Sequence, residues 1–327
     1  MILVIQSFGK EIEYRRAIFA IWSYWVYCPK GKVLLFTDAP AFFKTFFSNQ
    51  PIEYISLTPQ KIEEMRGKID FLHRMKIALI DEAFRLTNSN LLYIDSDTFF
   101  INDPTSLFNQ VSEKKSLMHL NEYRFDSLSE MKLPGGKTFR AFLDLITTTK
   151  FTRSDGTGIT VSPLQDSWNA GVIFLHHSHA QLLPDVYALT EQFYPPTQNH
   201  ASEQYAFSVV LQNHTDIAAC DSVIYHYWYR VKKKIMDEFL EKKLDEKWNL
   251  LSIDQKISSV KNGIRLLPKL FENHIWILRD NSIQAFNEKR IKPAFWFALR
   301  AVVKGPFDFR FLRDVMHHTR KLLLSGQ

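Results

Sequence analysis

Short apolar segments alternate with longer amphipathic segments over most of the chain, and this alternation restricts the fold more than any other feature of the sequence. Short apolar runs favour buried strands, whereas apolar residues that recur every three or four positions favour helices. Because a parallel strand pair needs a crossover connection, we expect an α/β fold with a mainly parallel central sheet that is flanked by helices. Sheets of this kind bind ligands at the carboxyl ends of their strands.

The same patterns set the expected order of elements. We predict strands at 2–8, 32–37, 52–57, 91–94, 116–120, 168–175 and 223–228. We predict helices at 11–26, 70–86, 137–147, 178–193 and 202–212, a helical turn at 40–47 and a loop at 151–165. Asp70 is expected to cap the helix that it begins. From about residue 233 the pattern is helical and charged, so the predicted domains are an α/β domain at 1–232 and a helical C-terminal region at 233–327.

The composition is typical of a globular protein of the cytosol. Of 327 residues, 46% are hydrophobic and 23% are charged, which allows a large core and excludes a disordered chain. Cys28 and Cys220 are expected to be ordinary buried thiols in a reducing compartment. No apolar stretch is long enough for a transmembrane helix, and the apolar N-terminus, which Lys10 and Glu11 soon follow, predicts a strand rather than a signal peptide. We therefore expect a cytoplasmic location.

The positive charge is concentrated at the C-terminal end. The net charge is +6, and the segment 289–327 alone has nine basic residues against two acidic ones, so the rest of the chain is nearly neutral. A uniformly basic protein would have indicated a nucleic-acid partner, which we do not expect. Aromatic and aliphatic residues are interleaved with the basic ones in this segment. The pattern predicts either an interfacial helix on the anionic inner face of a membrane or a helix packed on its own domain.

Asp95, Ser96 and Asp97 follow directly after the apolar strand predicted at 91–94. Two carboxylates one residue apart at a strand end are able to turn toward one divalent cation, and they repel each other without a partner. In most chains this pattern is only a solvated turn. Here the segment LLYIDSDTFFINDP resembles the metal-binding strand of GT-A nucleotide-sugar glycosyltransferases, especially glycosyltransferase family 8 and its relatives.

The resemblance covers roughly residues 1–230 and implies a fold, an activity and a cofactor. It implies the GT-A fold and transfer of a sugar from a nucleotide-diphosphate sugar, with a UDP-sugar as the expected donor, to a glycan, lipid-linked or protein acceptor. It also implies that Asp95 and Asp97 hold Mn²⁺ or Mg²⁺ against the donor diphosphate, where the cation stabilises the charge of the leaving group. Family 8 further implies retention of the anomeric configuration.

The segment Trp168-Asn169-Ala170-Gly171 resembles a second motif of these families, the N-A-G strand. The resemblance implies that Asn169, Ala170 and Gly171 take part in donor binding, because an amide suits sugar hydroxyls and a glycine permits close approach. A bulge or a turn is the alternative interpretation. Asp166, three residues earlier, is predicted to contact the donor sugar or the acceptor, or else to be an ordinary surface acid.

His226 lies within the last predicted strand, in Tyr225-His226-Tyr227-Trp228. The resemblance implies that it is the third protein ligand of the metal, and a neutral imidazole is an ordinary ligand of Mn²⁺. A core or edge histidine is the alternative. Lys232 is the candidate contact for the diphosphate, although the chain lacks the fuller H-x-x-G-x-x-K-P-W ending of the family.

Ser202-Glu203-Gln204 resembles the acidic residue and glutamine that begin a helix in these families. The resemblance implies that Glu203 or Gln204 faces the anomeric carbon of the donor. The alternative is that Glu203 only complements the helix macrodipole. An inverting enzyme would instead require a carboxylate base for the acceptor hydroxyl, and Asp166 or Glu203 would be the candidates.

Residues at the ends of the first two strands complete the predicted donor site. Ser7 and Phe8 resemble the nucleotide-contacting start of the fold, and Asp38 is predicted to bind the base or the ribose. Arg74 and Lys76 lie on the helix before Asp95, where they either reach phosphates or are merely solvated.

Two other functional classes remain to be separated from a glycosyltransferase. A nucleotidyltransferase that acts on sugar phosphates would use a similar sheet, but it normally has a Gly-rich basic loop after the first strand, and Ser7-Phe8-Gly9-Lys10-Glu11 is poor in glycine. A non-catalytic membrane- or partner-binding protein with a transferase-like fold is the second. The presence of Asp95, Asp97 and His226 together argues against it, because buried polar groups without a ligand destabilise a fold.

Overall fold

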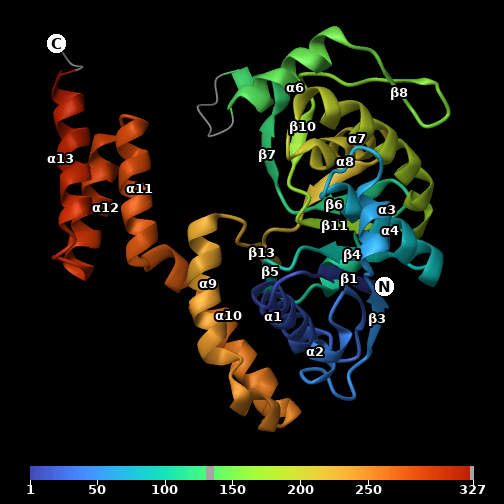
Figure 1. The fold of residues 1–327 in the computed structure, drawn as a ribbon, viewed down its shortest axis with the longest axis horizontal. Helices are drawn as coiled ribbons and strands as arrows, with labels where there is room; N and C mark the ends of the chain where they lie inside the picture. Colours follow the sequence, from blue (N-terminus) through green and yellow to red (C-terminus); the bar gives the residue numbers. More distant parts are fainter. Residues whose placement is uncertain (130–135, 325–327) are drawn as a thin grey trace. The chain divides into compact units, whose positions relative to one another are not determined.

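The computed structural model describes residues 1–129 and 136–324, and Figure 1 labels most of their elements. The chain forms two compact units: Met1–His226 with Glu246–Ile257, and Tyr227–Asp245 with Ser258–Gln327. The predicted boundary at 232/233 differs from this division mainly because 246–257 belongs to the first unit. Trp248, in that segment, packs edge-on against Trp22 with 6.1 Å between ring centroids. Burial of this aromatic pair explains why the segment 246–257 packs in the first unit.

A seven-stranded sheet with the strand order β12-β6-β11-β4-β1-β2-β3 forms the centre of the first unit. Its strands are β1 (Ile2–Ser7), β2 (Lys32–Thr37), β3 (Ile52–Ser56), β4 (Leu91–Ile94), β6 (Lys115–Met118), β11 (Val172–Leu175) and β12 (Asp216–Ala219). All neighbours are parallel except β11, which runs antiparallel to both β4 and β6. The predicted mainly parallel sheet is confirmed, and β12 is an edge strand that the sequence patterns did not indicate.

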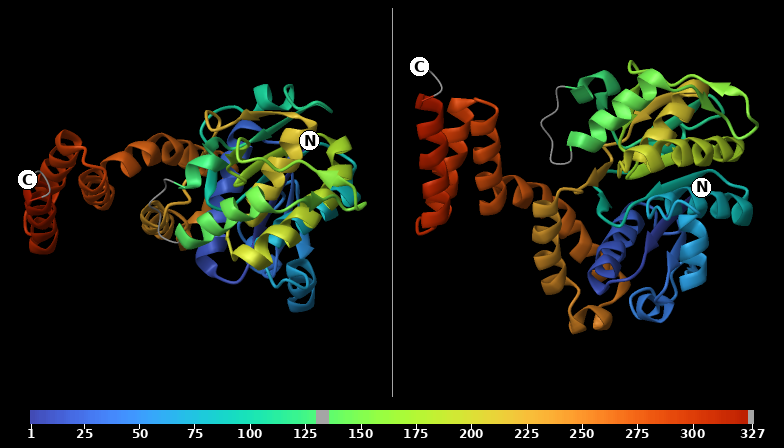
Figure 2. Two further views of the ribbon diagram at one scale, coloured as in Figure 1. Left: turned by 90° about the horizontal axis from the view of Figure 1, so that it is seen from above. Right: turned by 45° about the horizontal axis from the view of Figure 1, so that its top comes forward.

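Helices cover both faces of this sheet, as the two views of Figure 2 show. They are α1 (Glu11–Tyr27), α2 (Pro40–Lys44), α3 (Pro59–Arg66), α4 (Arg74–Thr87), α5 (Thr105–Phe108), α6 (Gly136–Thr148), α7 (Leu183–Thr197) and α8 (Ser202–His214), with 3₁₀ turns at η1 (Phe125–Ser129), η2 (His177–Leu182) and η3 (Glu246–Leu250). One core joins alternate strand residues, such as Ile2 and Val4 of β1, to α4, α6, α7 and α8. The intervening residues Leu3 and Ile5 are equally buried. A strand buried on both faces explains the continuous apolar run at the N-terminus.

Three local predictions need correction. Asp70 does not cap α4: it has a φ of 50° and pairs with Arg66, and the helix begins after His73, whose side chain makes no capping bond. The loop predicted at 151–165 contains a small hairpin of β8 (Phe151–Thr152) and β9 (Gly158–Ile159). The strand predicted at 168–175 is divided between β10 (Asp166–Trp168), which pairs with β7 (Asn121–Arg124), and β11. Residues 169–171 therefore link two sheets.

The last predicted strand also lies outside the central sheet. β13 (Ile224–His226) pairs with β5 (Thr98–Phe100) in a separate antiparallel ribbon, in which His226 is opposite Thr98. This register places His226 beside the turn that contains both aspartates. A sequence pattern shows that a strand is present but does not show its partner.

The second unit is helical, as predicted. Its elements are α9 (Arg230–Lys243), most of α10 (Ile253–Asn273), α11 (Ile275–Asn287), α12 (Ile291–Lys304) and α13 (Phe309–Leu324). A small core of Leu278, Ala298, Ala301 and Phe311 joins the last three helices. Among the described residues, no helix is both long enough and apolar enough to cross a bilayer.

Candidate active site

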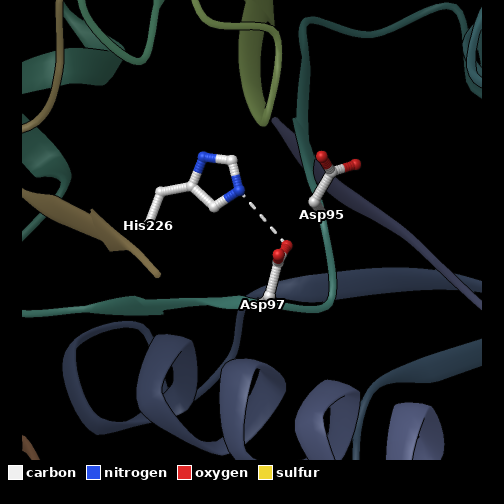
Figure 3. A group of neighbouring side chains, drawn as sticks. All are labelled: Asp95, Asp97 and His226. Atoms are coloured by element: carbon white, nitrogen blue, oxygen red, sulfur yellow. Dashed lines mark ion pairs between the residues drawn. The ribbon is translucent and has the colours of Figure 1, made fainter. Parts of the chain in front are cut away.

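Asp95, Asp97 and His226 meet at the carboxyl end of β4. The two aspartates lie in the turn between β4 and β5, and His226 ends β13, which pairs with β5. One ligating atom from each side chain lies within 4.8 Å of the others. Figure 3 shows His226 reaching from its strand toward the turn that carries both carboxylates. Two oxygens and one imidazole nitrogen form a donor set that suits Mn²⁺ or Mg²⁺.

Each ring nitrogen of His226 has a partner that fixes the orientation of the imidazole. Nδ1 lies 2.9 Å from Oδ1 of Asn169, and Nε2 lies 3.2 Å from Oδ1 of Asp97. An amide oxygen only accepts hydrogen bonds, so Nδ1 is the donor and Nε2 is directed at the carboxylate. Nε2 therefore faces Asp97 in the orientation that a metal-binding histidine adopts when its other nitrogen is bonded to a neighbouring acceptor.

Gly171 leaves the space that the ring of His226 occupies. A Cβ atom at this position would lie 2.0 Å from Cε1 of His226, which is closer than atoms in contact are found. The backbone N–H of Gly171 also donates to Oδ1 of Asn169 at 3.0 Å. The close approach predicted for this glycine is therefore the approach of a side chain that belongs to the site itself.

Asp95 is fixed by two buried side chains. Tyr93 donates its hydroxyl to Oδ1 at 2.7 Å, and Nζ of Lys76 lies 3.4 Å from Oδ2. Gln6 donates in turn to the hydroxyl of Tyr93 at 2.9 Å. Burial, together with the neighbouring Asp95 carboxylate, raises the pKa of Tyr93 well above its ordinary value, so this hydroxyl remains a donor. Neither Tyr93 nor Gln6 was identified from the sequence, because each is a polar residue within an apolar strand.

Lys76 joins Asp95 to Glu203 inside the protein. Its ammonium group lies 2.8 Å from Oε1 of Glu203 and donates to the carbonyl of Ala170 at 2.9 Å. Burial alone would lower the pKa of Lys76, but the carboxylates of Asp95 and Glu203 raise it overall, so the lysine stays charged. Lys76 therefore neutralises part of the acidic cluster. The sequence predicted either a phosphate contact or a solvated side chain for Lys76, and the structure instead places it in a buried ion pair.

Glu122 of β7 links the asparagine and glutamine motifs. It accepts from Nδ2 of Asn169 at 2.9 Å and from Nε2 of Gln204 at 2.8 Å. Gln204 also donates to Ser167 at 3.0 Å and accepts from the backbone N–H of Ala170 at 3.2 Å. The side chains of Asn169 and Gln204 thus both stabilise residues 169–171, which connect β10 to β11. Glu122 was not identified from the sequence, because it lies on a strand that the apolar pattern does not indicate.

Predicted nucleotide-binding residues lie at the ends of neighbouring strands. Ser7 is buried at the end of β1, and Phe8, which follows it, packs against the core. Asp38 follows β2 and accepts from the backbone of Gly9 at 3.0 Å and from the hydroxyl of Tyr14 at 2.8 Å. Ser96 donates to Glu13 at 3.2 Å. Because β4, β1 and β2 are adjacent and parallel, their carboxyl ends form one edge that includes the aspartates.

Two predicted site residues have partners other than the aspartates, and a third belongs to the second unit. Arg74 pairs with Glu191 at 2.9 Å, donates to the carbonyl of Met65 and lies over the ring of Tyr187. Asp166 begins β10, where its backbone N–H and carbonyl are both bonded to the side chain of Gln212. Lys232 belongs to α9 of the second unit. The structure does not bring Arg74 or Asp166 to the aspartates, and the role of Lys232 stays a prediction.

Comparison with known proteins finds similarity of structure only. No protein-family model matches the chain, and no curated protein matches it by sequence. Among solved structures, the glycosyltransferase GlyE of Streptococcus pneumoniae has a TM-score of 0.47 and 12% identity over 80% of this chain and 64% of that chain. The galactosyltransferase LgtC, solved with donor and acceptor sugar analogues, has a TM-score of 0.42 and 11% identity over 80% of this chain and 96% of that chain.

A third similar structure is a glycosyltransferase involved in glycosylation of the major capsid of the virus PBCV-1. It has a TM-score of 0.39 and 13% identity over 73% of this chain and 100% of that chain. The chain spans less than two-thirds of the length of GlyE. Values in this range describe a likeness of fold alone, so the function is argued below from the side chains.

Proposed function

We propose that this protein is a metal-dependent glycosyltransferase that transfers a sugar from a nucleotide-diphosphate sugar to an acceptor. The observation that carries the proposal is the convergence of Asp95, Asp97 and His226, whose ligating atoms lie within 4.8 Å of one another. The convergence occurs at the carboxyl end of a strand in a mainly parallel sheet, where such folds bind their ligands.

The protein environment fits a divalent cation at this position. His226 is held by Asn169, and Asp95 is held by Tyr93 and Lys76, so the donor atoms are oriented before any cation binds. Mn²⁺ or Mg²⁺, when bound, stabilises the negative charge that develops on the leaving nucleoside diphosphate. An imidazole ligand favours Mn²⁺, because Mg²⁺ prefers oxygen ligands.

The donor in this proposal is a UDP-sugar whose nucleoside lies along the adjacent strand ends. Ser7 and Phe8 end β1, and Asp38, which is exposed, follows β2. A carboxylate at this edge accepts hydrogen bonds from ribose hydroxyls or from the N–H of a base. The diphosphate then lies toward Asp95 and Asp97, where the cation would bridge it to the protein.

Transfer in this proposal proceeds with retention of configuration. Glu203 is buried and paired with Lys76 at 2.8 Å, so its carboxylate is not available to deprotonate an acceptor hydroxyl as an inverting enzyme requires. NMR of the anomeric proton of the product measures the outcome. A retained linkage is expected, and an inverted linkage would overturn the stereochemical part of the proposal.

A nucleotidyltransferase is the second candidate, and the turn after β1 disfavours it. A phosphate-binding loop presents free backbone N–H groups to its ligand. Here the N–H of Gly9 already donates to Asp38 at 3.0 Å. The turn is therefore closed by a carboxylate, which repels phosphate. A purely structural role for Asp95, Asp97 and His226 is disfavoured, because burying the carboxylate of Asp97 costs free energy.

An anionic membrane surface is the proposed docking partner, and lipid-linked glycans are accordingly among the proposed acceptors. α12 buries only small residues, Ala294, Ala298 and Ala301. Five of its large apolar residues are exposed: Ile291, Phe295, Trp296, Leu299 and Val303. Basic residues accompany them on the same helix, and basic side chains add about 1 kcal/mol each near anionic lipid. This exposed face supports the membrane alternative for the segment 289–327.

Vesicle sedimentation tests the docking proposal. The full-length protein is expected to pellet with phosphatidylglycerol vesicles at low salt, to be released by high salt, and to remain in the supernatant with phosphatidylcholine vesicles. The double variant Trp296→Ser/Leu299→Ser should lose pelleting without a change in unfolding temperature. If the wild-type protein stays in the supernatant with anionic vesicles, the docking proposal is wrong.

A thermal-shift panel tests the transferase proposal. The full-length protein is measured with UDP-, GDP- and dTDP-sugars, each with and without Mn²⁺. A donor at about 100 times its dissociation constant should stabilise the protein by about 2.7 kcal/mol. We expect one nucleotide sugar to raise the unfolding temperature, and only with Mn²⁺ present, followed by release of the nucleoside diphosphate on incubation. The absence of any shift across the panel would contradict the proposal.

A further inference from the structure

A cavity of about 620 Å³ lies within the second unit, between α9, α10, α11 and the end of α12. Its apolar lining consists of Phe239, Leu266, Leu270 and Ile275. Leu266 and Leu270 are 60% and 36% exposed, so two adjacent turns of α10 present leucines to an open space. The volume falls within the range of roughly 300–1,000 Å³ that small-molecule sites occupy.

The polar lining of this cavity is basic or neutral. Lys269, Asn273, His274 and Lys304 complete the lining, and no acidic residue lines it in the described part of the chain. Burial lowers the pKa of His274, although the nearby carboxylate of Glu238 opposes this shift, and the charges of Lys304 and Lys234 add a smaller lowering. Among the described residues that line the cavity, the charged ones are Lys269 and Lys304. Apolar walls beside two cations complement an anion that carries an apolar chain.

We propose that this cavity binds one anionic phospholipid, with an acyl chain against Leu266, Leu270 and Phe239 and the phosphate between Lys269 and Lys304. The inference does not depend on the proposed transferase activity, because every lining residue belongs to the second unit. It also differs from docking of α12 on a bilayer, since a single lipid molecule in solution is sufficient to occupy the cavity.

Isothermal titration calorimetry tests the inference with the full-length protein. The probe is dioctanoyl phosphatidylglycerol, kept below the concentration at which it forms micelles. We expect one lipid per chain, binding at least about tenfold weaker for dioctanoyl phosphatidylcholine, and binding at least about a hundredfold weaker for inorganic phosphate, which lacks the chain. Equal affinity for phosphate and lipid would overturn the inference, as would the absence of lipid binding.

Matched variants locate the site. Lys269→Gln and Lys304→Gln should each weaken binding by about three- to tenfold, because each removes one charged contact with the phosphate. Lys261→Gln, on the same helix but outside the lining, should leave binding unchanged. Leu270→Asp places a carboxylate at an already exposed position and should abolish binding while the unfolding temperature is retained. If Lys261→Gln weakens binding as much as Lys269→Gln does, the lipid is held by general surface charge and the inference fails.

Discussion

Helices α1 and α12 are both rich in large aromatic residues, but the two units use them in opposite ways. In α1, Trp22 and Trp25 are each only 1% exposed and pack edge-on against each other with 5.3 Å between ring centroids. In α12, Trp296 is 58% exposed and the buried positions are alanines. An apolar residue that is buried is explained by folding, whereas a contiguous exposed apolar face indicates a partner.

The polar residues of the two units differ in the same way. In the first unit, acidic, amide and imidazole side chains are gathered at one sheet edge and connected by hydrogen bonds, from Glu122 through Asn169 to His226. In the second unit, the charged residues that line the cavity in the described part of the chain are the lysines Lys269 and Lys304. We infer that the first unit is organised for chemistry and the second for attachment.

Loss of an aspartate in the first unit is expected to give the largest effect on activity. Asp97→Asn removes a charged metal ligand but keeps the shape of the side chain, so transfer should fall by about 10³-fold or more in kcat/KM. Circular dichroism should show an unchanged fold. Asp144→Asn, an exposed acid on α6, is the matched control and should retain activity. Activity of Asp97→Asn within tenfold of wild type would contradict the inference that the first unit is organised for chemistry.

Truncation of one tryptophan in each unit compares the two helices directly. Trp22→Ala removes contacts with Trp25, Phe47 and Trp248, and it should lower the free energy of unfolding by about 3–5 kcal/mol. Trp296→Ala should change it by no more than about 0.5 kcal/mol, because the side chain is exposed. Urea titrations of the full-length variants measure both values. A large loss on Trp296→Ala would mean that α12 is covered within the protein itself.

A methyl group at Gly171 is expected to give a smaller effect that is confined to the site. In Gly171→Ala the new Cβ collides with the ring of His226, so the imidazole must shift from the position in which it faces Asp97. Activity should fall by about 10- to 100-fold, and stability by about 1–3 kcal/mol. Gly158→Ala meets nothing within 4 Å and is the control. If excess Mn²⁺ fails to restore part of the lost activity in Gly171→Ala, the glycine acts by another route than the position of His226.

The sequence predicted the frame of the first unit well, because its strands are apolar runs and its helices are amphipathic. β2 and β4 have the predicted bounds, and the turn at Asp95 follows directly from the end of β4. Strand partners were not predictable in this way. The pairing of β13 with β5, and the division of 168–175 between two sheets, depend on contacts between residues far apart in the chain.

The sequence likewise predicted only part of the candidate site. Asp95, Asp97 and His226 belong to motifs, and the structure brings all three together. The residues that orient them are less visible in the sequence, since Tyr93 lies in an apolar strand and Lys76 lies between apolar helix residues. Arg74, only two positions from Lys76, points to a different set of partners, because residues two apart on a helix face different directions.

Manganese binding tests the central claim most directly. Electron paramagnetic resonance of Mn²⁺ titrated into the full-length, metal-free protein with UDP present counts bound ions without requiring the sugar or the acceptor to be known. The account predicts one Mn²⁺ per wild-type chain, with binding lost in Asp97→Asn and weakened about 10- to 100-fold in Asn169→Ala, which releases His226. Stoichiometric binding that survives in Asp97→Asn, or no binding by the wild-type chain, would contradict it.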